Sequence, residues 1–130
     1  MTYAVERAFA GRRELTGAET VPGLFFNATT LKDPSLRQDG LHTVEAMTLS
    51  SMDAFAPWKD TAPGKRPQEY AHLKAQLTER ILDAVECFVP GLRERTVFRA
   101  LGTPLTNAHF LHATGGGIYG TEKTLGNLGP

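Results

Sequence analysis

The feature that most constrains the fold is a run of apolar residues at helical spacing between Pro67 and Val89. Its members are Tyr70, Leu73, Leu77, Ile81, Val85 and Phe88. Spacings of three and four residues put them on one stripe of an α-helix. Pro67 suits the first helical turn, and Pro90 and Gly91 end the helix. Because such a stripe must pack on another layer, we expect a β-sheet beside this helix.

Two segments that precede the helix have the composition of β-strands. Leu24–Thr30 and Leu41–Leu49 are rich in aromatic and β-branched residues. Turn signals lie between them, at Asp33-Pro34 and at Asp39-Gly40. We therefore predict that the two strands pair like a β-hairpin with a long loop.

The segments around these elements complete the predicted order. Residues 51–67 hold three prolines and should form an irregular connector, which Trp58 anchors to the body of the domain. Residues 95–101 alternate in the manner of a third strand, which residues 102–106 break, and residues 106–113 should form one or two helical turns capped by Thr103 or Thr106. A short helix is also possible in residues 3–15. The predicted fold is a single α+β domain over residues 1–130, with a largely antiparallel sheet, one long amphipathic helix and short helices.

The composition excludes several classes of protein. Fourteen basic and fourteen acidic residues cancel, and no block of like charge marks a surface for nucleic acid. Cys87 is the only cysteine, which excludes an internal disulfide and fits a reducing, cytoplasmic compartment. No apolar stretch approaches the roughly 20 residues that a membrane-spanning helix needs.

The histidines, the cysteine and the glycine cluster are the residue types that often form functional sites, but their patterns in this sequence are weak evidence for one. His109 and His112 are spaced for one side of a helix, but no third ligand completes a metal site, so none is predicted. Cys87 lies one position off the apolar stripe, which favours a small half-buried side chain over a nucleophile. Gly115–Gly117 leaves three interpretations open: a phosphate loop, a flexible surface loop, or a backbone that approaches a flat ligand, with Tyr119 as a wall.

Three segments of the sequence together resemble a known protein family. They are LFFNATTLKDPSLRQDGLHTVEAMT from Leu24, the amphipathic helix, and VFRALGTPLTNAHFLHATGGGIYGTEKTLGNLGP from Val97. Together they resemble the C-terminal half of the phytoene desaturase, carotenoid isomerase and retinol saturase group. Members of that group are FAD-dependent oxidoreductases with an amine-oxidase-like architecture. The resemblance implies a substrate domain and redox or isomerisation chemistry on polyenes, carotenoid or retinoid.

The resemblance also implies site residues. Phe98, Leu101, Thr103, His109 and Phe110 would bind substrate, because a polyene pocket should be largely apolar. Gly116, Gly117, Ile118, Tyr119 and Gly120 would approach the flavin in a complete enzyme. No residue is assigned as catalytic. FAD would supply the chemistry in the parent enzyme, and the chain alone is expected to bind none, because its sequence has no GxGxxG motif.

The missing motif leads us to expect a fragment of a larger enzyme that is inactive alone, with residues 113–130 as a glycine-rich tail that would continue toward the flavin. Two alternatives stay open. One is a stand-alone module that binds an apolar ligand. The other is an interaction protein that pairs with itself or with a separate FAD-domain chain. The resemblance does not say which polyene is used, nor whether the parent enzyme lies at a membrane.

Overall fold

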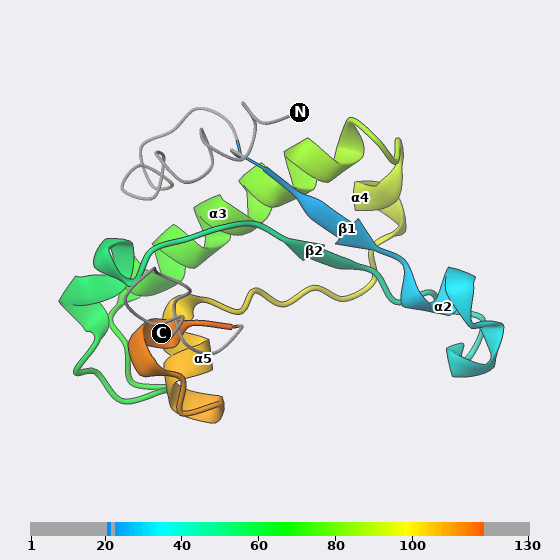
Figure 1. The fold of residues 1–130 in the computed structure, drawn as a ribbon. Helices are drawn as coiled ribbons and strands as arrows, with labels where there is room; N and C mark the ends of the chain where they lie inside the picture. The colour runs from blue at the N-terminus through cyan, green and yellow to red at the C-terminus, as the bar shows by residue number, and fades with distance from the viewer. Residues whose placement is uncertain (1–20, 22, 119–130) are drawn as a thin grey trace, which may run out of the picture.

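The long helix predicted from the apolar stripe is present in the structure. The computed structural model describes residue 21 and residues 23–118, and the longest element among them is α3 (Gln68–Glu86) (Figure 1). The other elements are β1 (Phe25–Asn27), α2 (Thr29–Lys32), the 3₁₀ helix η2 (Pro34–Leu36), β2 (Glu45–Met47), the 3₁₀ helix η3 (Met52–Trp58), α4 (Leu92–Arg95), α5 (Pro104–Phe110) and the 3₁₀ helix η4 (Thr114–Gly116). The expected short helix in residues 3–15 lies outside the described residues.

The predicted pairing of the first two strands is confirmed, although both strands are shorter than expected. β1 and β2 are antiparallel, with Phe25 opposite Met47 and Asn27 opposite Glu45. Within the loop between them, Asp39 and Gly40 both have positive φ, 52° and 75°, and Gln38 bridges Leu41. Two consecutive positive φ values are the mark of a type I′ hairpin turn, which an Asp-Gly pair favours.

The largely antiparallel sheet is wrong for the described part of the chain, which is mostly helical and holds a two-stranded sheet. Residues 95–101 were expected to add a third strand. Instead Arg95 ends α4, and Val97–Gly102 makes no backbone hydrogen bond to another described residue. A strand is defined by its ladder, so this run stays an extended connector between α4 and α5 for lack of a partner (Figure 1).

The core lies where α3, η3 and α5 meet. Phe55, Tyr70, Leu77 and Leu105 are buried there, and the partly buried residues packed on them are Met52, Ala54, Trp58, Leu73 and Leu101. The Trp58 ring meets Tyr70 edge to face, with centroids 5.6 Å apart. The predicted anchoring role of Trp58 is therefore confirmed, and the connector that carries it folds into η3 rather than staying irregular throughout.

The carboxyl end of α3 differs from the sequence expectation. The helix ends at Glu86, so Phe88 lies beyond it and is 80% exposed instead of extending the buried stripe. Cys87, expected to be half-buried, is exposed. The Glu86 carboxylate accepts hydrogen bonds from the amides of Gly91 and Arg93, at 2.6 and 3.0 Å. These bonds turn the chain directly into α4, which explains why the stripe stops early.

Candidate functional site

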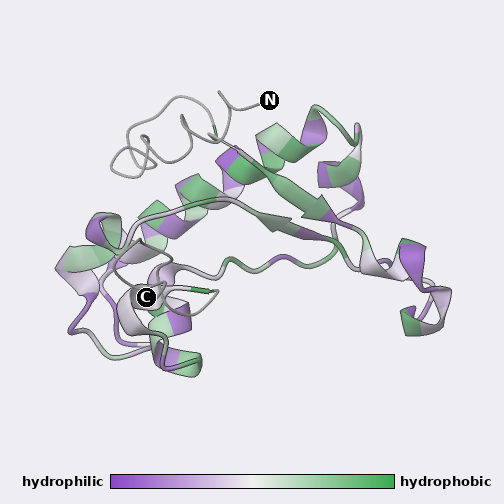
Figure 2. Cartoon of the chain, in the orientation of Figure 1, coloured by the Kyte–Doolittle hydropathy of each residue, from purple (hydrophilic) through white to green (hydrophobic). Residues whose placement is uncertain are grey.

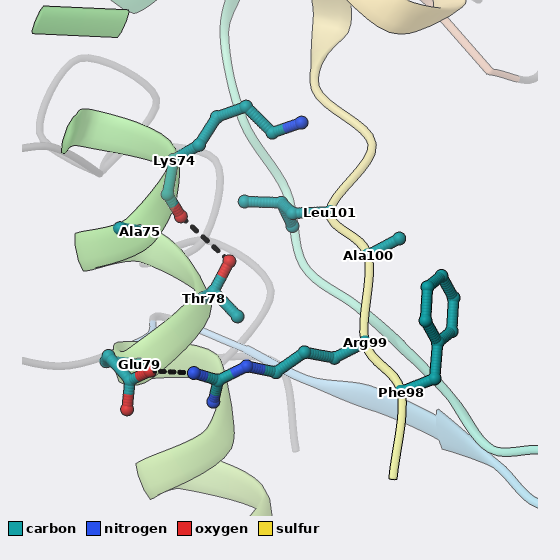
Figure 3. Close-up of a pocket in the computed structure, with 8 residues that line it drawn as sticks. All are labelled: Lys74, Ala75, Thr78, Glu79, Phe98, Arg99, Ala100 and Leu101. Atoms are coloured by element: carbon teal, nitrogen blue, oxygen red, sulfur yellow. Dashed lines mark hydrogen bonds and ion pairs between the residues drawn. The ribbon is translucent and has the colours of Figure 1, made fainter. Parts of the chain in front are cut away.

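An open groove runs between α3 and the extended connector, with a volume of about 470 Å³. Lys74, Ala75, Thr78 and Glu79 line it from the helix, and Phe98, Arg99, Ala100 and Leu101 line it from the connector (Figure 3). Residues 74 and 78 are four positions apart, as are residues 75 and 79, so all four lie on one face of α3. The groove therefore combines apolar side chains with one amine, one guanidinium and one carboxylate.

An ion-pair cluster closes one end of this groove. It consists of Glu79, Asp83, Arg93 and Arg99. Arg93 contacts both Glu79 and Asp83, the latter at 2.6 Å, and Arg99 contacts the other oxygen of Glu79 at 2.7 Å. The hydrogen bond from Arg93 is the main reason that the pKa of Glu79 lies below its ordinary value, and that bond also raises the pKa of Arg93. The cluster ties α4 and the connector to α3.

A buried hydrogen bond fixes the other end of the connector. The hydroxyls of Tyr70 and Thr103 lie 2.8 Å apart, and Arg66 donates to the Tyr70 oxygen at 3.2 Å. Thr103 precedes α5, and its amide donates to the Thr106 hydroxyl at 3.0 Å. Of the two predicted caps, Thr103 is the N-cap, and Thr106 lies three residues later in a capping box. The helix begins at Pro104 and ends at Phe110, earlier than the predicted residues 106–113, and these bonds hold its first turn against α3.

The glycine cluster folds back onto α5. Gly116 is buried with φ of 68°, and a Cβ on it would lie 2.4 Å from the Pro104 carbonyl oxygen. Asn107 Nδ2 donates to the Gly116 carbonyl at 3.1 Å. The amides of Gly116 and Gly117 donate to Ala113 and Thr114. A side chain is excluded at Gly116 because protein backbone occupies the space.

This geometry tests how well the described residues fit FAD. Two amides of the turn are already used within it, and the close approach that Gly116 permits is made to Pro104. Tyr119 and Gly120, the rest of the predicted flavin segment, lie outside the described residues. Ile118 is 51% exposed. The described residues alone do not form a cradle for FAD, so we derive no flavin step from them.

The predicted substrate-binding residues fall into three settings. Phe98 and Leu101 line the groove. Thr103 is buried, and its hydroxyl bonds to Tyr70. His109 and Phe110 stack on each other on α5, with centroids 4.6 Å apart, and are not among the groove residues. The structure therefore brings together two of the five.

The part of the chain that the structure describes holds no candidate metal centre. No three His, Cys, Asp or Glu side chains lie close enough together there to bind a metal ion. His112 follows the end of α5 and has φ of 51°, so it does not share a helical face with His109. Likewise, none of the described helices is long and apolar enough to cross a membrane.

Sequence reasoning missed Lys74, Glu79 and Arg99 as groove residues. Lys74 and Glu79 lie mostly off the apolar stripe, a pattern that predicts a solvated face of the helix, whereas Glu79 is half-buried and carries two ion pairs. A signal existed on the helix, because residues 74, 75, 78 and 79 share one face at helical spacing. Nothing in the sequence indicated that Arg99, twenty residues downstream of Glu79, would fold back to it.

Comparison with known proteins gives a consistent result. The chain is 33% identical to human all-trans-retinol 13,14-reductase, over 100% of this chain and 22% of that protein. It is 31% identical to the zebrafish all-trans-retinol 13,14-reductase, over 89% of this chain and 19% of that protein. It is 34% identical to the chloroplastic prolycopene isomerase of Arabidopsis thaliana, over 78% of this chain and 16% of that protein.

No family model and no solved structure matches the chain. The chain spans about a fifth of the length of the curated relatives that it matches. Two kinds of relative, a retinol reductase and a carotenoid isomerase, nevertheless align with most of it. The chain is therefore a distant homologue of one segment of the retinol saturase and carotenoid isomerase group.

Proposed function

We propose that the chain is the substrate-facing segment of an oxidoreductase that acts on carotenoid or retinoid polyenes. The observation that carries this proposal is the similarity over the whole chain to human all-trans-retinol 13,14-reductase, together with the match to prolycopene isomerase. The names of both relatives specify conjugated polyenes. The chain corresponds to a fifth of these proteins, so we expect it to have no turnover by itself.

In this proposal the groove beside α3 receives part of the polyene. On the connector, Leu101 supplies apolar surface toward α3, and Phe98 supplies it on the outer side, while Ala75 on the helix leaves room for a flat chain of conjugated carbons (Figure 3). Lys74 lies at the groove with its amine about 6.0 Å from the centre of the Tyr70 ring. An ammonium at this place suits a polar end group on the ligand, such as a hydroxyl or a carboxylate.

The remaining predicted site residues receive different roles. His109 and Phe110 would extend the apolar contact along α5, where Phe110 is 72% exposed. Thr103 would act by holding the connector, because its hydroxyl is bonded to Tyr70. In the complete enzyme FAD would supply the redox chemistry, and the segment from Gly116 to Gly120 would lie near the flavin. The chain alone is expected to take up no flavin.

Quenching of Trp58 fluorescence by all-trans-retinol tests the proposal. Trp58 is the sole tryptophan, and its emission overlaps retinol absorption, so bound retinol should quench it. We expect saturable quenching that is weakened roughly tenfold by the double substitution Phe98→Ser and Leu101→Ser. Phe88→Ser, at an equally exposed phenylalanine outside the groove, is the matched control. Quenching that never saturates, or that is unchanged in the groove variant, would contradict this proposal.

A second candidate function is that of an interaction module. The observation in its favour is the amount of exposed apolar surface on the described residues. Phe25 and Met47, which face each other across the sheet, are 58% and 38% exposed, and Figure 2 shows β1 as largely hydrophobic. Monomeric proteins rarely leave a contiguous apolar surface of large area in water. A homo-oligomer would cover part of it, and light scattering of the purified chain tests for one.

A further inference from the structure

Among the described residues, the backbone of the connector Val97–Gly102 has no backbone hydrogen-bonding partner. Val97 and Phe98 are 78% and 82% exposed. An accessible row of unpaired amides and carbonyls is a template on which another strand can add.

The side chains of the connector already point as those of a strand do. Figure 3 shows Arg99 and Leu101 directed toward α3, while Phe98 and Ala100 point the other way. Alternation with a period of two is the geometry of a β-strand. A second strand could therefore pair here without a change in the directions of these side chains.

The sequence of the connector is complementary to itself. In an antiparallel pair with Arg99 opposite Arg99, Phe98 lies opposite Ala100 and Val97 lies opposite Leu101. Each large apolar side chain then faces another apolar residue, and the largest faces the smallest. The two Phe98 and two Ala100 side chains would form one apolar cluster on the face that α3 does not cover.

Charge does not oppose this arrangement. Arg99 is the one charged residue in Val97–Leu101, and each copy neutralises it with its own Glu79 at 2.7 Å. The formal net charge of the chain is zero at pH 7, so two copies do not repel each other at long range. A second copy of this chain is therefore an occupant that matches the connector in pattern, size and charge.

We propose that Val97–Leu101 is a dimerisation strand, which pairs antiparallel with the same strand of a second copy about a two-fold axis at Arg99. The interface is isologous, so each copy contributes the same edge and the assembly closes at two. This inference deepens the second candidate function. It does not depend on polyene chemistry. Because Phe98 and Leu101 belong to both the groove and the proposed strand, the crosslink at residue 99 described below separates the two proposals: it reports the dimer whether or not retinol binds.

Charge exchange across the proposed strand pair tests both the interface and its register. Phe98→Glu alone and Ala100→Lys alone should each raise the dimer dissociation constant on the order of tenfold, since each places two charges against an apolar residue. The double substitution Phe98→Glu with Ala100→Lys should restore dimerisation, because each new carboxylate then faces the amine of the partner. Analytical ultracentrifugation over a concentration series gives the constants, and circular dichroism checks that helix content is kept.

A crosslink gives an independent test of the same register. In a Cys87→Ser background, Arg99→Cys would place two thiols directly across the two-fold axis, at a Cα separation of about 4.5–5.5 Å that a disulfide can bridge. Oxidation should then give a covalent dimer. Ala100→Cys in that background is the control and should crosslink more slowly, because its symmetry mate is displaced along the strand. A parent chain that is monomeric at high concentration, or a dimer that none of these substitutions affects, would overturn the proposal.

Discussion

At the residue scale, Glu79 joins three parts of the molecule. Its carboxylate lies on α3, bonds to Arg93 of α4 and pairs with Arg99 of the connector. Asp83 takes the second nitrogen of Arg93 at 2.6 Å. A network in which one carboxylate pairs with two guanidinium groups contributes more to stability than isolated surface ion pairs do. The position of the connector beside α3 therefore depends on the ionised form of Glu79.

We expect stability to fall with pH through protonation of Glu79. The pKa of this carboxyl is lowered from 4.5 in the folded chain, chiefly by the hydrogen bond from Arg93. A group with a depressed folded pKa stabilises the protein above its unfolded pKa, and the stabilisation is lost as pH falls through the folded pKa. Urea unfolding between pH 7 and about pH 3 should show the difference between the parent chain and Glu79→Gln shrinking below about pH 4.5.

The control for this experiment is Glu94→Gln. Glu94 lies exposed on α4 and belongs to none of the ion pairs of the cluster. Its substitution should leave the pH dependence of the unfolding free energy almost unchanged. A difference between Glu79→Gln and the parent that is constant from neutral to acid pH would contradict the assignment.

Gly115 and Gly116 differ in why a side chain is disfavoured. At Gly115 the reason is the left-handed backbone alone, and at Gly116 it is also the lack of space for a Cβ. Both have positive φ, 61° and 68°, but a Cβ at Gly115 meets open space while one at Gly116 meets Pro104. Gly115→Ala should destabilise by about 1 kcal/mol, the left-handed backbone penalty. Gly116→Ala should destabilise by about 1–3 kcal/mol more, because backbone must also move. Thermal unfolding measures both. Equal losses would mean that the contact with Pro104 is unimportant.

At the element scale, α3 organises the described residues, and its buried face has two ends of different character. At the amino-terminal half, Tyr70 and Leu77 belong to the core with Phe55 and Leu105. At the carboxyl end, Val85 is buried but lies outside that core cluster. The apolar stripe therefore extends beyond this core cluster, to a second buried position at Val85.

Truncation along the stripe should show where it is used. Leu77→Ala removes a side chain that is 5% exposed within the core, and we expect a loss of about 2–5 kcal/mol. Phe88→Ala truncates a larger side chain that is 80% exposed, and the change should stay within about 0.5 kcal/mol. Chemical denaturation compares the two variants. A large loss for Phe88→Ala would show that this ring is covered in solution.

At the whole-molecule scale, packing is uneven. The core joins α3, η3 and α5 at one end, while every residue from Leu31 to Glu45 is exposed. This arm carries part of α2, η2 and the Asp39-Gly40 turn, and Figure 1 shows it extending away from the rest of the described chain. A segment with few buried contacts opens at a smaller free energy than the core does.

Hydrogen exchange should reveal this difference. Amides in the arm should exchange far faster than those of α3 near Leu77, because opening the arm exposes little buried surface. Exchange followed by mass spectrometry resolves the two regions in one experiment. Equal protection of the arm and α3 would indicate that another surface covers the arm. The proposed dimer should protect Val97–Leu101 and leave the arm unchanged.

Elements whose signals are local were predictable from sequence. The stripe of α3, the Thr103 cap of α5 and the Asp-Gly turn all act through neighbours a few positions away. The site was less predictable. Phe98 and Leu101 were assigned to it through a resemblance, while Lys74 and Glu79 were taken for solvated residues because a helix pattern does not show what folds against its polar face.

The amino-acid sequence was sufficient to predict the long helix α3, the pairing of β1 with β2 and the group of enzymes that the chain resembles, since these depend on local pattern and on residue identity. It did not predict α2 and α4, which overlap segments with the composition of strands. Only the tertiary structure decided the fate of Val97–Leu101, Glu79 and Gly116. The connector has the alternation of a strand, yet a strand requires a partner. The role of Glu79 depends on an arginine twenty residues away, and that of Gly116 on a carbonyl twelve residues before it. Contacts between distant residues are set by packing, which no local pattern encodes.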